Sequence, residues 1–223
     1  MRIVSIEGNI GSGKSTIVNH LKHLADNKKL ENELIFLLEP VDEWEKIVDS
    51  DGTNILTKYY ADQERYAFSF QMMAFITRLR QINEIIEKYS DQDVTIVTER
   101  CIFTDREIFA KMLYNDSKIE KIEYSIYINW FDYFVKNINI DKYIYINTPP
   151  DICLERIAKR NRSGEHIPLE YLQNLDTFHK VWLGSKENMI EIDGTSENTN
   201  NTNNTNNTNN TNNIDTIIKE LFV

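Results

Sequence analysis

The chain has 223 residues, of which 41% are hydrophobic, and this size and composition predict a single globular domain spanning 1–223. Acidic residues outnumber lysine and arginine by 35 to 25, so a formal net charge of -10 would repel a phosphate-coated polymer, and we expect no nucleic acid partner. The two cysteines, Cys101 and Cys153, form no Cys-x-x-Cys pair, which favours free thiols in a reducing compartment. Strand-like residues begin at Arg2 and no run of about 18 apolar residues occurs, so we expect a cytoplasmic protein without a membrane partner.

Predicted strands and helices alternate along most of the chain. Short apolar runs predict five strands, at 2–6, 34–38, 94–98, 143–147 and 189–192. Apolar residues at helical spacing predict helices at 14–25, 54–89, 102–114, 119–137, after the Thr148-Pro149-Pro150 segment, and at 214–223. Alternation of this kind, with strands that are near-continuous apolar runs, is typical of a parallel sheet with helices on both faces. The sequence therefore predicts an α/β fold with a five-stranded parallel sheet.

Asparagine and threonine repeat with period three at about 198–213. This tract has no apolar side chain to bury, so we expect a disordered insertion in a surface loop between the last strand and a terminal helix. Its Asn-Asn-Thr triplets match the glycosylation pattern, but without a secretory signal we expect no glycan.

A phosphate-binding loop is predicted directly after the first strand. Residues Gly8-Asn9-Ile10-Gly11-Ser12-Gly13-Lys14-Ser15-Thr16 contain the pattern G-x-x-x-x-G-K-S between a strand and a helix, which is the context of a P-loop. Backbone N–H groups would converge on phosphate oxygens, Lys14 would reach the β and γ phosphates, and the Ser15 hydroxyl would bind Mg²⁺. The Asn-Lys-x-Asp motif of GTPases is absent and no coupling domain for a motor exists, so a kinase is favoured.

Two predicted strands end in charged residues suited to phosphoryl transfer. Glu39 follows the second strand, and Glu99 and Arg100 end the third. Ligands of open α/β sheets bind at the carboxyl ends of the strands, so we expect these residues to lie beside the phosphate-binding loop. A kinase needs a base near the acceptor hydroxyl and cations around the transferred group. Structural ion pairs at the strand ends are the alternative interpretation.

Further motifs follow the P-loop in order. They are Glu-Pro-Val-Asp-Glu-Trp at 39–44, Phe-Gln at 70–71, Glu-Arg-Cys-Ile-Phe-Thr-Asp-Arg at 99–106, Arg-Asn-Arg-Ser-Gly-Glu at 160–165 and Ile-Pro-Leu-Glu-Tyr-Leu from 167. Together they resemble the deoxyribonucleoside kinase family of the deoxycytidine, deoxyguanosine and deoxyadenosine kinase type, over nearly the whole chain except the asparagine-rich tract. The resemblance implies transfer of the γ-phosphate of ATP, with Mg²⁺, to the 5′-hydroxyl of a deoxyribonucleoside in nucleotide salvage.

Position by position, the resemblance implies roles around the reacting groups. Glu39 would take the proton from the 5′-hydroxyl, and Arg100 would hold Glu39 and the reacting oxygens in place. Glu99 would join Ser15 at Mg²⁺. The family's lid, which closes over the ATP phosphates, falls at about 156–167 and carries three arginines: Arg156, Arg160 and Arg162.

The resemblance also implies a nucleoside site. Tyr60 and Glu165 match the pair that binds the 3′-hydroxyl, and Gln71 matches the residue that hydrogen-bonds the edge of the base. The matching aromatic walls of the base pocket are Trp44, Phe70 and Phe109. Taken without the resemblance, these aromatic side chains could equally belong to the hydrophobic core.

Base preference is expected to depend on Ala74, Arg78 and Asp105. Arginine and aspartate at the last two positions resemble the deoxycytidine and deoxyguanosine types, whereas the thymidine-accepting insect type has apolar residues there. A thymine carbonyl facing Asp105 would be repelled, so we expect thymidine to be a poor substrate. Because Ala74 is small, we expect a purine, deoxyguanosine or deoxyadenosine, to be preferred, with deoxycytidine as an alternative.

Two other functions fit parts of the pattern. A nucleoside monophosphate kinase such as thymidylate kinase shares the P-loop, the sheet and a lid, but its acceptor motif is only partly matched at 105–107. A catalytically silent P-loop subunit is disfavoured by the intact set of charged residues. The resemblance further implies a homodimer formed through the helices near 66–88 and 119–137.

Overall fold

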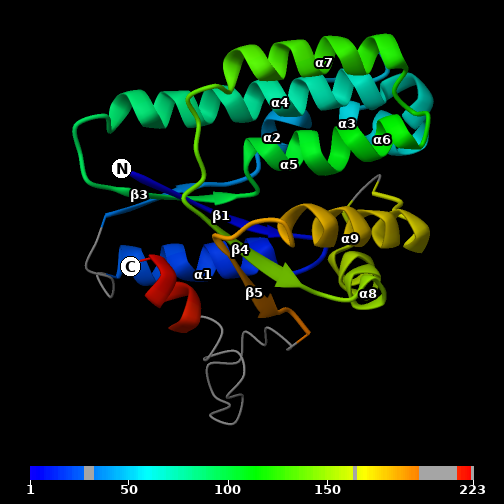
Figure 1. Ribbon diagram of the computed structural model, residues 1–223. Coiled ribbons are helices and arrows are strands. Elements are labelled where there is room, and N and C mark those ends of the chain that lie inside the picture. Colours follow the sequence, from blue (N-terminus) through cyan, green and yellow to red (C-terminus); the bar gives the residue numbers. More distant parts are fainter. Residues whose placement is uncertain (28–32, 163–164, 196–214, 222–223) are drawn as a thin grey trace.

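Five parallel strands form one sheet in the order β2-β3-β1-β4-β5 (Figure 1). The strands are β1 (Arg2–Gly8), β2 (Leu34–Leu37), β3 (Thr95–Glu99), β4 (Lys142–Asn147) and β5 (Met189–Asp193). The computed structural model describes residues 1–27, 33–162, 165–195 and 215–221. The predicted α/β fold with a parallel sheet is confirmed, and the ends of the strands differ from those predicted by only one or two residues.

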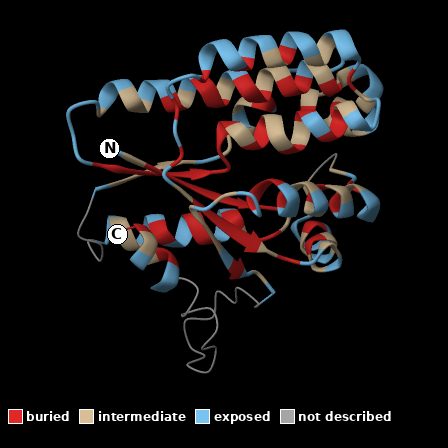
Figure 2. Ribbon diagram, viewed as in Figure 1, coloured by how far each residue is buried: buried red, intermediate tan, exposed pale blue. Residues whose placement is uncertain are grey.

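The two faces of the sheet carry different helices. Val4 and Ile144 belong to a buried cluster on one face, together with residues of α1 (Lys14–Asp26) and of the helical segment 215–221. Residues of the opposite face, such as Ile3, pack into a larger cluster with most of the remaining helices. Buried residues therefore follow the strands and the inward sides of the helices (Figure 2).

Nine further helical elements lie between the strands in the described part of the chain. They are α2 (Val41–Trp44), α3 (Ile55–Ala61), α4 (Gln63–Lys88), α5 (Ile102–Thr104), the π-helical turn η1 (Asp105–Ala110), α6 (Lys111–Asn115), α7 (Lys121–Phe134), α8 (Pro150–Arg160) and α9 (Leu169–Leu183). In the part of the chain that the structure describes, no helix has the length and apolarity needed to span a membrane.

Two predicted helices are interrupted in the structure. The helix predicted at 54–89 divides into α3 and α4 at Asp62, whose backbone leaves the helical region at φ -148° and whose side chain accepts a hydrogen bond from the N–H of Arg65. The helix predicted at 102–114 contains η1 as a π-helical turn that begins at Asp105. Such turns occur frequently at functional sites. The predicted insertion at 198–213 lies outside the described residues.

Candidate functional site

A cavity of about 1190 Å³ opens beyond the carboxyl ends of β1, β2 and β3. Its walls include most of the predicted phosphate-binding, catalytic and base-binding residues, together with residues of α8 and α9. Pockets for one drug-sized ligand usually measure about 300–1000 Å³. The cavity is therefore large enough for a nucleotide and a second, smaller substrate.

The predicted phosphate-binding loop connects β1 to α1. Gly11 and Gly13 have φ values of 79° and 100°, and a Cβ atom on Gly11 would lie 2.5 Å from the carbonyl oxygen of Cys153, so both positions require glycine. Lys14 is buried, and its Nζ donates to the backbone carbonyl of Asn9 at 2.6 Å. Burial, aided by repulsion from Arg100, lowers the pKa of Lys14 to about 7. A bound polyphosphate would favour the charged form of this lysine.

Ser15 and Glu99 meet at the edge of this loop. The Ser15 hydroxyl donates to Oε1 of Glu99 at 2.6 Å, which joins the start of α1 to the end of β3. Mg²⁺ prefers oxygen ligands and is usually bound by one or two protein groups together with substrate phosphates. The donor set therefore fits Mg²⁺, which would neutralise charge on the transferred phosphate. Among the described residues, no three His, Cys, Asp or Glu side chains gather to bind a metal by themselves.

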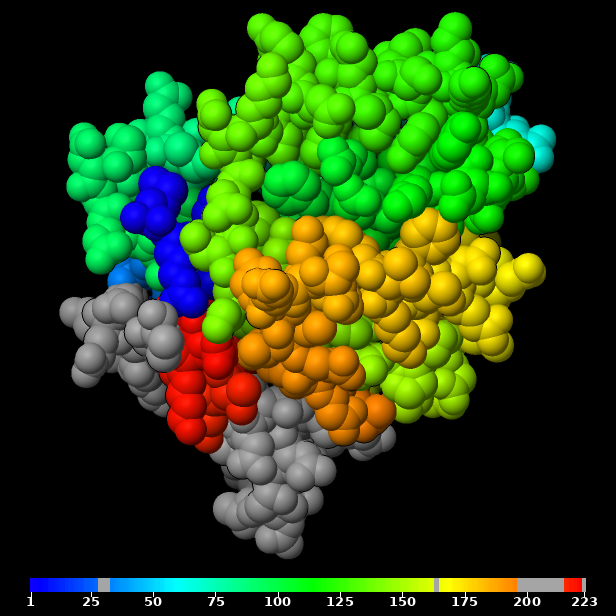
Figure 3. Space-filling model, in the orientation of Figure 1, coloured from blue at the N-terminus to red at the C-terminus, as the bar shows by residue number. Residues whose placement is uncertain are grey.

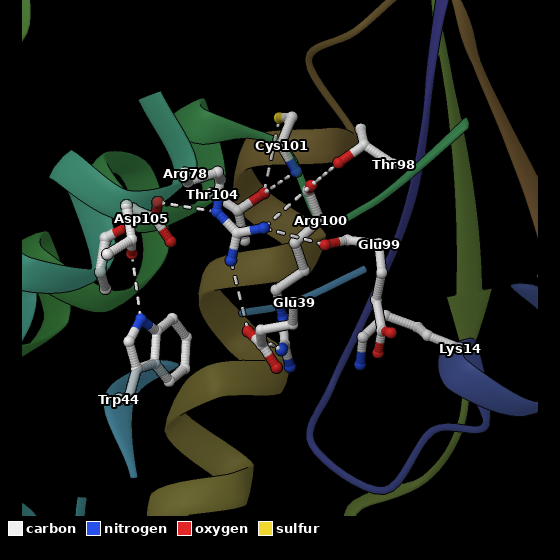
Figure 4. A network of polar contacts seen from close by, with 12 residues as sticks. Lys14, Glu39, Trp44, Arg78, Thr98, Glu99, Arg100, Cys101, Thr104 and Asp105 are labelled. Atoms are coloured by element: carbon white, nitrogen blue, oxygen red, sulfur yellow. Dashed lines mark hydrogen bonds and ion pairs between the residues drawn. The ribbon is translucent and has the colours of Figure 1, made fainter. Parts of the chain in front are cut away.

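Glu39 lines the cavity and is held between two arginines (Figure 4). Its Oε1 accepts hydrogen bonds from Arg100 at 2.9 Å and from Arg78 at 3.3 Å. Burial alone would raise the pKa of Glu39, but Arg100 and Arg78 outweigh it and hold the pKa at about 2. The carboxylate is therefore ionised at neutral pH, on the same edge of the sheet as the phosphate-binding loop.

The predicted base pocket adjoins Glu39. Trp44 and Phe70 make an edge-to-face contact with ring centroids 5.3 Å apart, and Phe109 lies under the guanidinium of Arg100 at 5.1 Å. Gln71 also lines the cavity, and its buried Oε1 has no hydrogen-bond partner among the described residues. A buried acceptor left unpaired is rare in folded proteins and marks a place where a ligand can donate.

Arg78 and Asp105 form a buried ion pair, with Nε of Arg78 2.9 Å from Oδ2 of Asp105. Asp105 lines the cavity beside Ala74, whereas Arg78 lies outside the cavity walls and also donates to the backbone carbonyl of Glu99 at 3.0 Å. Burial raises the pKa of Asp105 to about 6, although Arg78 opposes this effect. In this arrangement Asp105 lines the cavity, and Arg78 pairs with both Asp105 and Glu39 from behind its wall.

Residues of the predicted lid and 3′-hydroxyl site also line the cavity. Arg160 donates to both carboxylate oxygens of Glu165, at 2.7 and 2.6 Å. Burial, followed by the charges of Tyr171 and then of Glu165, raises the pKa of the Tyr60 hydroxyl, which is consistent with the proximity of the two predicted sugar-binding residues. Arg156 donates to the backbone carbonyl of Ser12 at 3.3 Å. Arg162 also lines the cavity.

Comparison with protein families matches residues 4–222 to the family described as deoxynucleoside kinase. The chain belongs to the deoxynucleoside kinase family. Human deoxycytidine kinase is 37% identical over 193 residues, which are 81% of this chain and 74% of that protein. Chicken deoxycytidine kinase 2 is 33% identical over 88% of this chain and 79% of its own length. Human mitochondrial thymidine kinase 2 is 31% identical over 81% of this chain and 64% of its own length.

This deoxynucleoside kinase is an ATP-dependent phosphotransferase, as predicted. Its site also contains a residue to which the sequence analysis assigned no role. Tyr171 of α9 lines the cavity, and its hydroxyl lies 2.8 Å from that of Tyr59 of α3. Tyr171 belongs to the Ile-Pro-Leu-Glu-Tyr-Leu motif, so its position in the sequence was a usable signal. The predicted free thiols Cys101 and Cys153 are confirmed, and both are buried.

Proposed function

We propose that this kinase transfers the γ-phosphate of Mg²⁺-bound ATP to the 5′-hydroxyl of deoxycytidine. The observation that carries the choice of base is the pair of acceptors in the pocket, the unpaired Oε1 of Gln71 and the carboxylate of Asp105. Cytosine has an exocyclic amine that can donate to them, whereas thymine has a carbonyl at that position. The relatives named deoxycytidine kinase support the same choice.

Deoxyadenosine and deoxyguanosine are proposed as secondary acceptors. Ala74 is buried and lines the cavity. Its small side chain, which led us to expect a purine, supports room for the larger ring system of that base. Both purines also carry an exocyclic amine. Deoxycytidine is now placed first because several of the matched relatives carry its name.

In the proposed mechanism the γ-phosphate of ATP and the 5′-hydroxyl of the nucleoside meet beside Glu39. The phosphate-binding loop and Lys14 bind ATP, Ser15 and Glu99 bind Mg²⁺, and the lid arginines neutralise charge on the transferred group. Glu39 accepts the proton of the 5′-hydroxyl, and Arg100 orients Glu39. A carboxylate with a pKa of about 2 is a weak base, so the proton of the 5′-hydroxyl is transferred late, after the bond between the γ-phosphate and the departing ADP has weakened.

Tyr60 and Glu165 are proposed to bind the 3′-hydroxyl, while Trp44, Phe70 and Phe109 enclose the base. A monophosphate acceptor is disfavoured because Arg106, the arginine of the 105–107 segment, pairs with Glu107 and Asp132 and does not line the cavity. No cation from this segment is therefore directed at an acceptor phosphate.

The experiment that tests the proposal compares kcat/KM for deoxycytidine, deoxyadenosine, deoxyguanosine, thymidine and dTMP with Mg²⁺ and ATP. We expect deoxycytidine to give the highest value and thymidine a value at least about 10-fold lower, because a site that hydrogen-bonds an amine discriminates against analogues lacking it. Equal use of thymidine would overturn the base assignment. Reaction with dTMP alone would overturn the nucleoside acceptor.

The pH dependence of kcat/KM should test whether Asp105 binds the base. Its pKa of about 6 in the free enzyme predicts that kcat/KM for deoxycytidine falls as the pH is lowered through about 6, because the protonated carboxyl has lost its negative charge and is a weaker acceptor for the amine. Glu39 stays ionised over this range. In Asp105→Asn, kcat/KM should be lower but should lack this acid limb. Persistence of the limb in that variant would assign it to another group.

The expected homodimer is proposed to form through α7 and α4. Side chains of α7 expose a large apolar surface, which includes Ile122, Trp130 and Tyr133, and the adjacent helix α4 exposes Ile76. Helix α7 lies at the outer surface of the molecule (Figure 3). Burial of this surface against a second copy would stabilise a dimer of twice the 26.3 kDa chain mass, measurable by sedimentation.

We also propose a cytoplasmic location and a role in nucleotide salvage.

A further inference from the structure

Glu7 is a buried carboxylate for which phosphoryl transfer has no evident use. It is the residue before Gly8 in β1, and its side chain is completely inaccessible to solvent. Among the described residues it makes no ion pair. Its Oε1 accepts hydrogen bonds from the hydroxyl of Ser5 at 2.5 Å, from the backbone N–H of Cys101 at 3.0 Å and from the hydroxyl of Thr104 at 2.7 Å. Its Oε2 lies 2.8 Å from the same Thr104 oxygen.

A buried carboxylate without a cation partner is costly unless hydrogen bonds compensate for the lost hydration. Here the compensation comes mainly from one short segment, because Cys101 and Thr104 belong to the turn that leaves β3 and enters α5. Glu7 therefore ties that turn to the strand that leads into the phosphate-binding loop. An apolar residue at this position would avoid the cost but could not hold the turn.

The turn contains Arg100 in an unusual backbone conformation. Arg100 has a φ of 59°, a left-handed conformation that non-glycine residues rarely adopt. Hydrogen bonds fix the peptide groups on both sides of it: its N–H donates to the carbonyl of Ile6 at 3.0 Å, its carbonyl accepts from the Thr98 hydroxyl at 2.6 Å, and the next N–H donates to Glu7. With the backbone fixed in this way, the guanidinium reaches Glu39 (Figure 4).

The same turn leads to the residue proposed to contact the base. Thr104 ends α5 and Asp105 begins η1, so the hydrogen bond between Thr104 and Glu7 locates the residue directly before Asp105. Thr104 is itself fully buried, and its oxygen also accepts from the N–H of Cys101 at 3.3 Å. Displacement of Thr104 would therefore move Arg100 and Asp105 together.

We propose that Glu7 is a positioning residue that, through Cys101 and Thr104, holds Arg100 in its left-handed conformation and Asp105 at the base pocket. This inference rests on the proposed function of Arg100 and Asp105. Glu7 touches neither substrate in this arrangement, and it acts by making the phosphate-binding loop, the arginine beside Glu39 and the base-binding carboxylate one rigid unit.

The test replaces Thr104 by valine, which keeps the shape but removes the hydroxyl donor, and by serine, which keeps the donor. For Thr104→Val we expect kcat with deoxycytidine to fall about 10-fold or more and the preference for deoxycytidine over thymidine to narrow, with KM for ATP changed less than about 3-fold. Thr104→Ser should retain most of both properties. Thr95→Val, which removes a buried hydroxyl at the other end of β3, serves as the control for a stability effect alone.

A second variant and a double mutant keep the test decisive if valine destabilises the fold. Glu7→Gln is nearly isosteric and should also lower kcat more than it raises KM for ATP. In the Glu39→Gln background, Thr104→Val should cost less than it does alone, because its effect acts through Arg100 and Glu39. Full additivity, or unchanged kcat and base preference in Thr104→Val, would overturn the role of Glu7. Failure of the wild type to phosphorylate any deoxynucleoside would instead overturn the proposed function.

Discussion

Replacement of Glu39 by glutamine is expected to lower kcat for deoxycytidine by at least about 100-fold, in line with the contribution of general bases. The amide keeps the size of the side chain, and its oxygen can still accept a hydrogen bond from Arg100, but it cannot take the proton of the 5′-hydroxyl. ATP binding should change little because Lys14 and the phosphate-binding loop are intact. Steady-state kinetics with a separate measurement of ATP binding gives both quantities.

Glu45→Gln provides the matched control for this experiment. Glu45 undergoes the same chemical change and lies six residues further along the chain, but it is exposed and does not line the cavity. Its kcat should equal that of the wild type. If Glu39→Gln kept near-normal turnover, Glu39 would not be the base, and its pairing with Arg100 would be structural.

Replacement of Arg78 by methionine together with Asp105 by alanine is expected to raise kcat/KM for thymidine relative to deoxycytidine by about 10-fold or more. The double change removes Asp105, the acceptor that repels the thymine carbonyl, and Arg78, the cation that pairs with Asp105. Both partners are changed, because Arg78 without Asp105 would keep only Glu39 as a partner, and Asp105 without Arg78 would be left as an uncompensated buried charge. The measurement is kcat/KM for the two nucleosides under identical conditions.

Arg80→Met is the control for the change in base preference. Arg80 lies on the same helix as Arg78 but is about half exposed, pairs with Glu43 and Glu84, and does not itself line the cavity. It should leave the ratio of the two kcat/KM values unchanged. An unchanged ratio in the double variant as well would mean that the base binds elsewhere in the cavity.

The sheet and the phosphate-binding loop were predictable because each depends on local sequence. Buried parallel strands are short apolar runs, and the loop has a fixed pattern between a strand and a helix. The position of Glu39 next to Arg100 followed from a general rule about the carboxyl ends of strands. These predictions needed no knowledge of how the helices pack.

Other features depend on contacts between distant residues. The break at Asp62 carries no glycine or proline, so hydrophobic spacing alone suggested one continuous helix. Arg78 was expected to contact the base, but its place behind the cavity wall depends on the packing of α4 against β3 and η1. The contact of Tyr171 with Tyr59 spans 112 positions in the chain and could not be obtained from spacing.

The ion pair between Arg160 and Glu165 joins residues proposed to bind different substrates, the ATP phosphates and the 3′-hydroxyl of the nucleoside. ATP must therefore compete with Glu165 for Arg160, and the nucleoside must compete with Arg160 for Glu165. Whichever substrate binds first breaks the ion pair and leaves the other residue available. By thermodynamic linkage, ATP and nucleoside should then increase each other's affinity for the enzyme by the same factor. The coupling free energy between the two substrates would come from the ion pair that the unliganded enzyme already contains.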